Sequence, residues 1–197
     1  LHKMNFAAPE MRSIIDALTC KLRETALPFK SGELAMILYS LHNSDNNNSV
    51  LELLREIPRV MKNMVGNITS QELAMCFYGL LHTPCPETER LVDILMPELI
   101  KQHDLLDGGQ VSMIISGMRS VQNESHVKTL FQYLESRVPQ LNFDRQTIGT
   151  CLTALAHIGQ YSQSNLLFHM LIAKLPKIAA EPLHRTAADC NGARNVL

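Results

Sequence analysis

One phrase of eleven residues is written twice in this chain and then recurs more faintly at nearly constant spacing. SGELAMILYSL (31–41) and SQELAMCFYGL (70–80) share seven of their eleven letters at an offset of 39 positions. GGQVSMIISGM (108–118) follows 38 positions later, and RQTIGTCLTAL (145–155) follows 37 positions after that. A degraded fifth copy, HRTAADCNGA (184–193), stands close to the last residue. Self-similarity at such a period is typical of repeat proteins built from stacked units.

The repeated phrase has the pattern of an amphipathic helix, which we call helix A. Apolar residues recur at i, i+3, i+4 and i+7, and in the second copy these are Leu73, Cys76, Phe77 and Leu80. At two other positions of the phrase, which we call columns, every copy has a small residue, and one of these columns contains Gly79 and Gly117. Glycine lowers helix propensity by about 1 kcal/mol relative to alanine. Its presence there predicts that a neighbouring helix comes very close at these positions.

A second apolar phrase recurs between the copies of helix A and predicts a helix B in each unit. It carries a proline in one register, at Pro58, Pro97, Pro139 and Pro176, and Cys20 occupies the same slot near the N-terminus. Proline removes a backbone donor and clashes with the preceding turn, so it should bend or end each helix B. Polar segments rich in Asn, Ser, Gly and Pro separate helix A from helix B. No segment alternates with period two for long enough to predict a strand.

These patterns predict an all-α fold, a right-handed α-solenoid of about four to five helix-turn-helix repeats of 37–39 residues. We expect a single domain over residues 1–197, and hydrophobic residues, at 46% of the chain, suffice for its core. No apolar run reaches the length of about eighteen residues that spans a bilayer, so no membrane insertion is expected. The predicted units are helix B of a partial first repeat at 10–27, repeats at 31–66, 69–104, 107–142 and 144–179, and a partial last repeat at 183–197.

Charge and cysteine usage exclude several classes of function. The formal net charge of −1 leaves no global electrostatic footprint for nucleic acid. The five cysteines include no C-x-x-C pair, and an odd count without a disulfide framework favours a reducing compartment or free thiols. Cys76 and Cys151 fall in an apolar helix column and are expected in the core. The nearest approach to a zinc motif is Cys85 beside His82, and without clustered ligands we expect no metal and no cofactor.

Motifs for catalysis are missing from the sequence. It contains no phosphate-binding glycine loop, no G-x-S-x-G elbow and no H-E-x-x-H. The two glycines of DGGQ (107–110) stand where helix A begins, so we interpret them as a turn, with Asp107 or Asp144 as helix caps. His42, His82 and His157 end successive copies of helix A without a recurring carboxylate partner. We therefore expect no enzymatic activity and no small-molecule substrate.

The repeat unit resembles a known family. A period of about 37 to 38 residues, a helix A like SQELAMCFYGL and a helix B like LVDILMPEL are similar to the heptatricopeptide-type and octotricopeptide-type repeats, which are organellar α-solenoids found in many RAP-domain proteins. The resemblance runs from about residue 10 to the end. It implies an organellar location, for which we predict the mitochondrial matrix, and a role in transcript processing, translation or the ribosome. The chain departs from the pattern in its neutral charge, in Asp189 at an apolar position, and in lacking a recognisable RAP domain.

A second face of helix A is a candidate binding strip, because it is polar yet almost uncharged. Tyrosine and histidine stack on bases, and Asn, Ser and Thr hydrogen-bond base edges, so the strip could bind single-stranded RNA. The alternative is an ordinary solvated or inter-helix face, with Tyr39 and Tyr78 half buried. Beside the column of Met36, Met75, Met113 and Thr150, the strip comprises Tyr39, Asn43, Tyr78, His82, Ser116, Ser120, Thr153, His157, Asn191 and Asn195.

Contacts with phosphate would have to come from lysine and arginine around helix B. Glutamates are interspersed with these cations, as is typical of a solvated face of mixed charge. The candidate residues are Arg55, Arg59, Lys62, Lys101, Lys128, Arg137, Lys174 and Lys177.

Three functions remain after these exclusions, and the first two are from different classes. The first is a non-catalytic structural adaptor in a large organellar ribonucleoprotein, with the mitochondrial ribosome favoured, that contacts neighbouring proteins and rRNA. The second is a single-stranded RNA-binding factor for organellar transcript processing or translation, and an accessory subunit of a respiratory complex is a third. The chain starts at Leu1 without a signal segment, as a processed protein or a fragment would. Half-repeats at both ends expose apolar faces, which predicts an isolated protein that is oligomeric or poorly soluble.

Overall fold

The computed structural model describes residues 8–24, 28–44, 47–64, 66–158 and 164–175, and this part of the chain is all-α, as expected. The repeated phrase forms α2 (Ser31–Ser40), α4 (Ser70–Gly79), α6 (Gly108–Gly117) and α8 (Arg145–Ile158). The second phrase forms α1 (Pro9–Glu24), α3 (Asn48–Lys62), α5 (Pro86–Gln102), α7 (Glu124–Arg137) and α9 (Ser164–Ile172). Short 3₁₀ helices follow four of them: η1 (Leu41–Asn43), η2 (His103–Leu105), η3 (Met118–Ser120) and η4 (Val138–Gln140).

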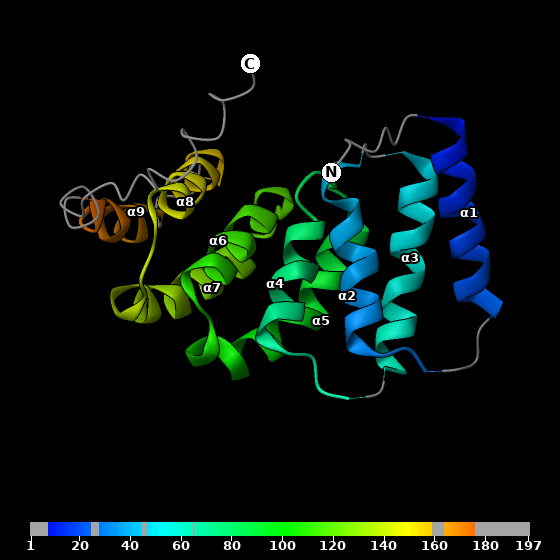
Figure 1. Cartoon of the computed structure of the whole chain (residues 1–197), viewed down its shortest axis with the longest axis horizontal. Coiled ribbons are helices and arrows are strands. Elements are labelled where there is room, and N and C mark those ends of the chain that lie inside the picture. The colour runs from blue at the N-terminus through cyan, green and yellow to red at the C-terminus, as the bar shows by residue number, and fades with distance from the viewer. Residues whose placement is uncertain (1–7, 25–27, 45–46, 65, 159–163, 176–197) are drawn as a thin grey trace, which may run out of the picture.

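The helices lie in two rows. In the A row, α2 packs on α4, α4 on α6, and α6 on α8. In the B row, α1 packs on α3, α3 on α5, α5 on α7, and α7 on α9. Figure 1 shows the helix pairs following one another across the molecule, from α1 in blue at one end to α9 in orange at the other. Residues about one period apart in the sequence therefore lie on neighbouring helices of the same row.

Side-chain caps fix where the helices of the A row begin. Before α4, the Thr69 hydroxyl accepts from the Glu72 backbone N–H, and the Glu72 carboxylate accepts from the Thr69 N–H at 2.8 Å. Asp107 accepts from the Gln110 N–H at 2.8 Å before α6, and Asp144 accepts from the Thr147 N–H at 2.6 Å before α8. These bonds satisfy donors that the first turn leaves free, and they confirm both aspartates as caps.

The apolar columns of the repeated phrase form the core between the two rows. Phe77 of α4 and Phe131 of α7 are the largest fully buried side chains among the described residues. Cys76 and Cys151 are buried as expected. Burial raises the pKa of the Cys76 thiol to about 12 and that of Cys151 to about 11, so both remain protonated at neutral pH.

The small-residue column that contains glycine marks a close approach between helices of the A row. A Cβ at Gly79 would lie under 3.0 Å from the Leu38 carbonyl of α2, and one at Gly117 under 3.0 Å from the Phe77 carbonyl of α4. The neighbouring atoms are backbone, so no side-chain rotation could make room. The prediction of a very close neighbour at this column is therefore confirmed for α4 and α6.

The recurring proline does not act in the same way in each helix B. Pro58 lies inside α3 and Pro97 inside α5, and both helices continue past it. Pro139 lies in η4, just after α7 ends at Arg137. The expected ending at proline is therefore found only at α7, whereas α3 and α5 continue beyond their prolines. Pro176 and the predicted repeat at 183–197 lie outside the described residues.

Candidate functional site

An aromatic cluster joins α2 to α4 at the strip predicted from sequence. The rings of Tyr39 and Tyr78 stack with centroids 5.7 Å apart, and the His42 ring lies 5.1 Å from Tyr39 and 5.2 Å from Tyr78. His42 Nδ1 donates to the Tyr39 carbonyl at 2.7 Å, so its Nε2 accepts from the Asn43 amide at 2.8 Å. Tyr39 remains 37% exposed, which leaves the outer side of the stack open to a ligand.

Two adjoining hollows continue this surface across α4, α6 and α8, and together we call them the helix-A trough. They have volumes of about 450 Å³ and about 390 Å³. They share Tyr78, Gln146 and Thr150, so they form one continuous depression. The larger is also lined by Tyr39, Gln71, Asp107, Gly109, Gln110, Ser112, Met113, Asp144 and Thr147, and the smaller by Leu81, Ser116, Arg119, Gly149, Thr153 and Ala154.

The structure brings together about half of the predicted strip. Tyr39, Tyr78, Ser116 and Thr153 line the trough. Ser120 is buried instead, and its hydroxyl donates to the Leu81 carbonyl at 2.7 Å, which ties η3 to the end of α4. The exposed residues Asn43, His82 and His157 line neither hollow, and Asn191 and Asn195 lie outside the described residues.

Charges in the trough are separated between its two ends. Asp107 and Asp144, the caps of α6 and α8, stand at one end, and Arg119 of η3 stands at the other. The backbone N–H of Thr147 lowers the pKa of Asp144, so this carboxyl stays ionised. Partial desolvation and the positive charge of Arg119 lower the pKa of His82, which keeps that imidazole neutral near pH 7. The trough therefore has an acidic end and a basic end, with uncharged polar groups between them.

Several trough residues were not singled out from the sequence. Gln71, Gln110 and Gln146 come from the first turns of three successive helices of the A row, and Gln110 Nε2 donates to Gln71 Oε1 at 3.2 Å. The signal for them was a glutamine near the start of the second, third and fourth copies of the phrase, to which we had assigned no role in binding. Arg119 carried little signal, because the only other copy with a lysine or arginine at that position is the degraded fifth one, at Arg194.

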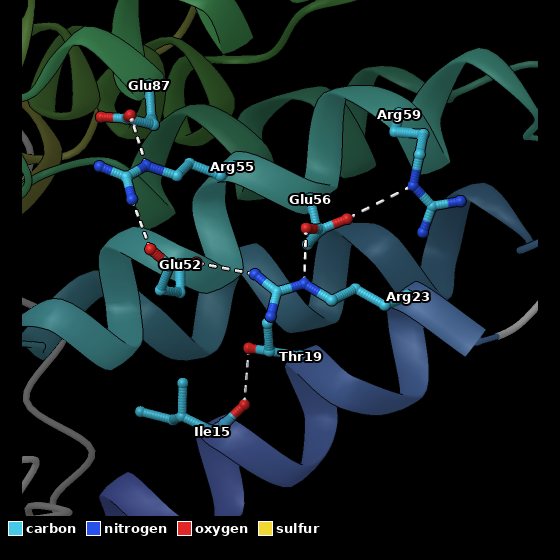
Figure 2. A network of polar contacts seen from close by, with 8 residues as sticks. All are labelled: Ile15, Thr19, Arg23, Glu52, Arg55, Glu56, Arg59 and Glu87. Carbon is cyan, nitrogen blue, oxygen red and sulfur yellow. Dashed lines mark hydrogen bonds and ion pairs between the residues drawn. The ribbon is translucent and has the colours of Figure 1, made fainter.

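Most of the predicted phosphate-binding cations of α3 are held by protein groups. Arg55 donates to Glu87 of α5 at 2.9 Å and also pairs with Glu52. Arg59 donates to the Leu22 carbonyl of α1 at 2.6 Å. Figure 2 shows that Arg23 of α1 joins these residues, with its guanidinium 2.7 Å from both Glu52 and Glu56. We call the connected set the ion-pair ladder; its members are Arg23, Glu52, Arg55, Glu56, Arg59 and Glu87. The ladder joins α1, α3 and α5, and a phosphate would have to displace carboxylates to reach its arginines.

The other predicted cations behave in two ways. Arg137 donates to the Leu106 carbonyl at 3.1 Å and ties the last turn of α7 to the segment that leads into α6. Lys174, just after α9, donates to the Leu141 carbonyl at 2.7 Å and ties this end of α9 to the segment that leads into α8. Lys101 pairs with Glu98 at 2.6 Å. Lys62 and Lys128 are exposed, and Lys177 lies outside the described residues.

The ion-pair ladder predicts a defined pH dependence of stability. The hydrogen bond from Arg55 lowers the pKa of Glu87, whose side chain is 10% exposed, so the pair stabilises the fold above the ordinary glutamate pKa of about 4.3. This contribution is lost as the pH falls through the lowered pKa of the folded protein. Glu87→Gln should reduce the free energy of unfolding by about 1 kcal/mol at pH 7. Urea unfolding at pH 7 and pH 3 should show that this difference becomes smaller in acid.

The matched control for this measurement is Glu98→Gln. Glu98 forms an exposed pair with Lys101 within one helix, and such pairs contribute no more than about 0.5 kcal/mol. If Glu87→Gln had no larger effect than Glu98→Gln at pH 7, the ladder would not be a stabilising link between α3 and α5.

Metal and membrane sites do not emerge from the described part of the chain. Within it, no group of three or more His, Cys, Asp or Glu residues is arranged to hold a metal ion. The Cys85 thiol forms a hydrogen bond with the Thr88 hydroxyl. Nor does any helix among those residues have both the length and the apolar character needed to cross a bilayer.

Comparisons with protein-family models, with curated proteins and with solved structures found no match to this chain. The trough and the ion-pair ladder are therefore the observations from which its function has to be inferred.

Proposed function

We propose that this protein is a non-catalytic helical-repeat adaptor, a right-handed α-solenoid that holds other subunits of a large organellar ribonucleoprotein. The mitochondrial ribosome, in the matrix, is the assembly that the sequence resemblance favours. The observation that carries the adaptor role is the helix-A trough, an open surface that crosses three helices of the A row and is lined mainly by uncharged polar and aromatic side chains. Such a lining suits recognition of a partner.

The arrangement of the helices supports the solenoid. Each helix packs mainly on its neighbours one repeat away in its own row, and α2, α4 and α8 also pack on helix B of their own unit, as in quasi-one-dimensional stacks. The close approach at Gly79 and Gly117 recurs with the period of the sequence, so neighbouring units are related by a similar step. A stack of this kind presents one continuous face along its A row, which is the surface an adaptor needs.

The distribution of charge supports protein contacts over direct RNA binding as the main role. Arg55, Arg59, Arg137 and Lys174 are engaged by carboxylates or carbonyls of the protein. Asp107 and Asp144 in the trough would repel a phosphate backbone. Contact with rRNA is therefore proposed as secondary, through exposed cations such as Lys62 and Lys128.

A second candidate function, direct binding of single-stranded RNA, is favoured by one observation. The stacked Tyr39–Tyr78 pair with its attached His42 ring is a platform of the kind on which unpaired bases stack. Its weakness is that most of the predicted phosphate-binding cations are already engaged by protein groups.

Sedimentation of the native protein from an organellar lysate tests the adaptor role. We expect it to travel with ribosome-sized particles, to shift to lighter fractions after RNase treatment, and to bring ribosomal proteins with it in mass spectrometry. A small free species that crosslinks to RNA would favour the second candidate function. Migration with a membrane complex regardless of RNase would contradict both and would leave a respiratory accessory subunit.

A further inference from the structure

We propose that the helix-A trough binds an extended peptide segment of a partner protein, with a basic side chain at the Asp107–Asp144 end and an acidic group at the Arg119 end. The inference rests on the proposed adaptor function and specifies the chemistry of the partner at that surface. It follows from the length of the trough, from its hydrogen-bonding groups and from its separated charges.

The trough has the dimensions of a short extended chain. It runs along α6, from the cap Asp107 to Arg119 just beyond the last turn. Twelve steps at 1.5 Å per residue make this about 18 Å. An extended peptide advances about 3.3 Å per residue, so about five or six residues would span the two charged ends.

The groups along the trough match a peptide backbone, which alternates a donor and an acceptor. The hydroxyls of Thr150 and Thr153 donate to carbonyls of their own helix at 3.0 and 2.8 Å, which leaves their oxygens able to accept from a ligand N–H. The side-chain amide of Gln146 offers both a donor and an acceptor. Gly149 lies between these positions, and a Cβ added to it would meet no atom within 4 Å, so a peptide backbone could approach α8 closely there.

Charge complementarity selects a peptide over a nucleic acid as the occupant. None of the described residues lining the Asp107–Asp144 end is positively charged, so these two carboxylates attract a lysine or arginine side chain and repel phosphate. Among the described residues that line the smaller hollow, Arg119 is the one with a charge, and it would pair with an aspartate, a glutamate or a chain-terminal carboxylate. A polyanion such as RNA would satisfy Arg119 and oppose the other end.

Selection from a display library of random twelve-residue peptides, with the full chain as target, tests the proposal. We expect enriched sequences that place Lys or Arg about five positions from Asp or Glu. The strongest one, made synthetically with a fluorescent label, should bind at least tenfold more weakly to Asp107→Asn/Asp144→Asn. Asparagine is as good a helix cap as aspartate, so this variant removes the charges and keeps both helix starts. Arg119→Gln should weaken binding to a similar extent.

Steric variants supply the matched control. Thr150→Trp fills the trough from an exposed position on α8 and should abolish binding, whereas Gln132→Trp, at an exposed position on α7 in the B row, should leave binding unchanged. Absence of any enriched motif, or equal binding of the peptide to the charge-neutralised variant, would overturn the proposal. So would a labelled octauridine RNA that binds more tightly than the peptide and is excluded by Thr150→Trp.

The peptide-binding experiment and the sedimentation experiment can fail independently of each other. If the native protein sediments with particles but no peptide binds the trough, the adaptor role stands and the peptide site is wrong. If the peptide binds as expected but the protein never joins a particle, the peptide site stands and the ribonucleoprotein role is wrong.

Discussion

Gly117→Ala is expected to lower the free energy of unfolding by about 2–3 kcal/mol, although alanine is the better helix former by about 1 kcal/mol. The added Cβ would lie under 3.0 Å from the carbonyl of Phe77, which belongs to the backbone of α4. Only a shift of α6 away from α4 could relieve this contact. Such a shift would loosen the packing of Ile114 and Met118, both of which are fully buried.

Gly149→Ala is the matched control, since it makes the same chemical change within the A row. No atom lies within 4 Å of a Cβ added at Gly149, so only the gain in helix propensity remains. We expect it to raise the free energy of unfolding by about 0.5–1 kcal/mol. Urea unfolding of the two variants beside the parent protein measures both effects. A stabilising Gly117→Ala would show that α4 and α6 do not approach as closely as the structure describes.

The helices of the A row were predictable because local and repeated signals agree there. α2, α4 and α6 begin at Ser31, Ser70 and Gly108, where the first three copies of the phrase begin. The apolar stripe predicted which face of each helix is buried, and the column of small residues predicted where neighbouring helices come close. Boundaries in the B row were harder to predict, since α5 begins at Pro86, inside a segment expected to be a loop. A proline in the first turn favours a helix start, but prolines in a polar segment are equally typical of a loop.

The candidate site was only partly predictable, because it depends on how each helix is rotated against the next. Ser120 and His82 occupy the same column of the repeat, yet Ser120 bonds to the Leu81 carbonyl while His82 is exposed. The trough combines Tyr78 of one column with Thr150 of another. Which columns meet is set by the angle and offset between helices, and a single sequence does not encode these as a local pattern.

The cations of helix B illustrate the same limit for electrostatics. Arg55 and Glu87 are 32 positions apart and belong to different predicted repeats. The glutamates interspersed among the lysines and arginines of helix B correctly indicated a face of mixed charge. Only the packing of α3 on α5 shows that these charges pair across helices and join neighbouring units.

Phe131→Ala is expected to have the largest effect on stability, a loss of about 3–5 kcal/mol. Phe131 lies on α7, is 1% exposed, and belongs to the core that α7 shares with its neighbours. Truncation removes a buried ring and leaves a cavity that helices on both sides keep open. Phe131→Leu, which keeps most of the volume, should cost about 1–1.5 kcal/mol, and denaturant unfolding of both variants gives the comparison.

The location of the damage distinguishes a stack of units from a single cooperative core. α7 packs on α5 and α9 within the B row, whereas α1 and α2 lie at the far end of the molecule (Figure 1). In a quasi-one-dimensional stack, a local loss spreads mainly to adjacent units. Hydrogen exchange of Phe131→Ala should therefore accelerate in α5, α7 and α9 and change little in α1 and α2. Equal acceleration in every helix would contradict the solenoid, and with it the continuous A-row face on which the adaptor role depends.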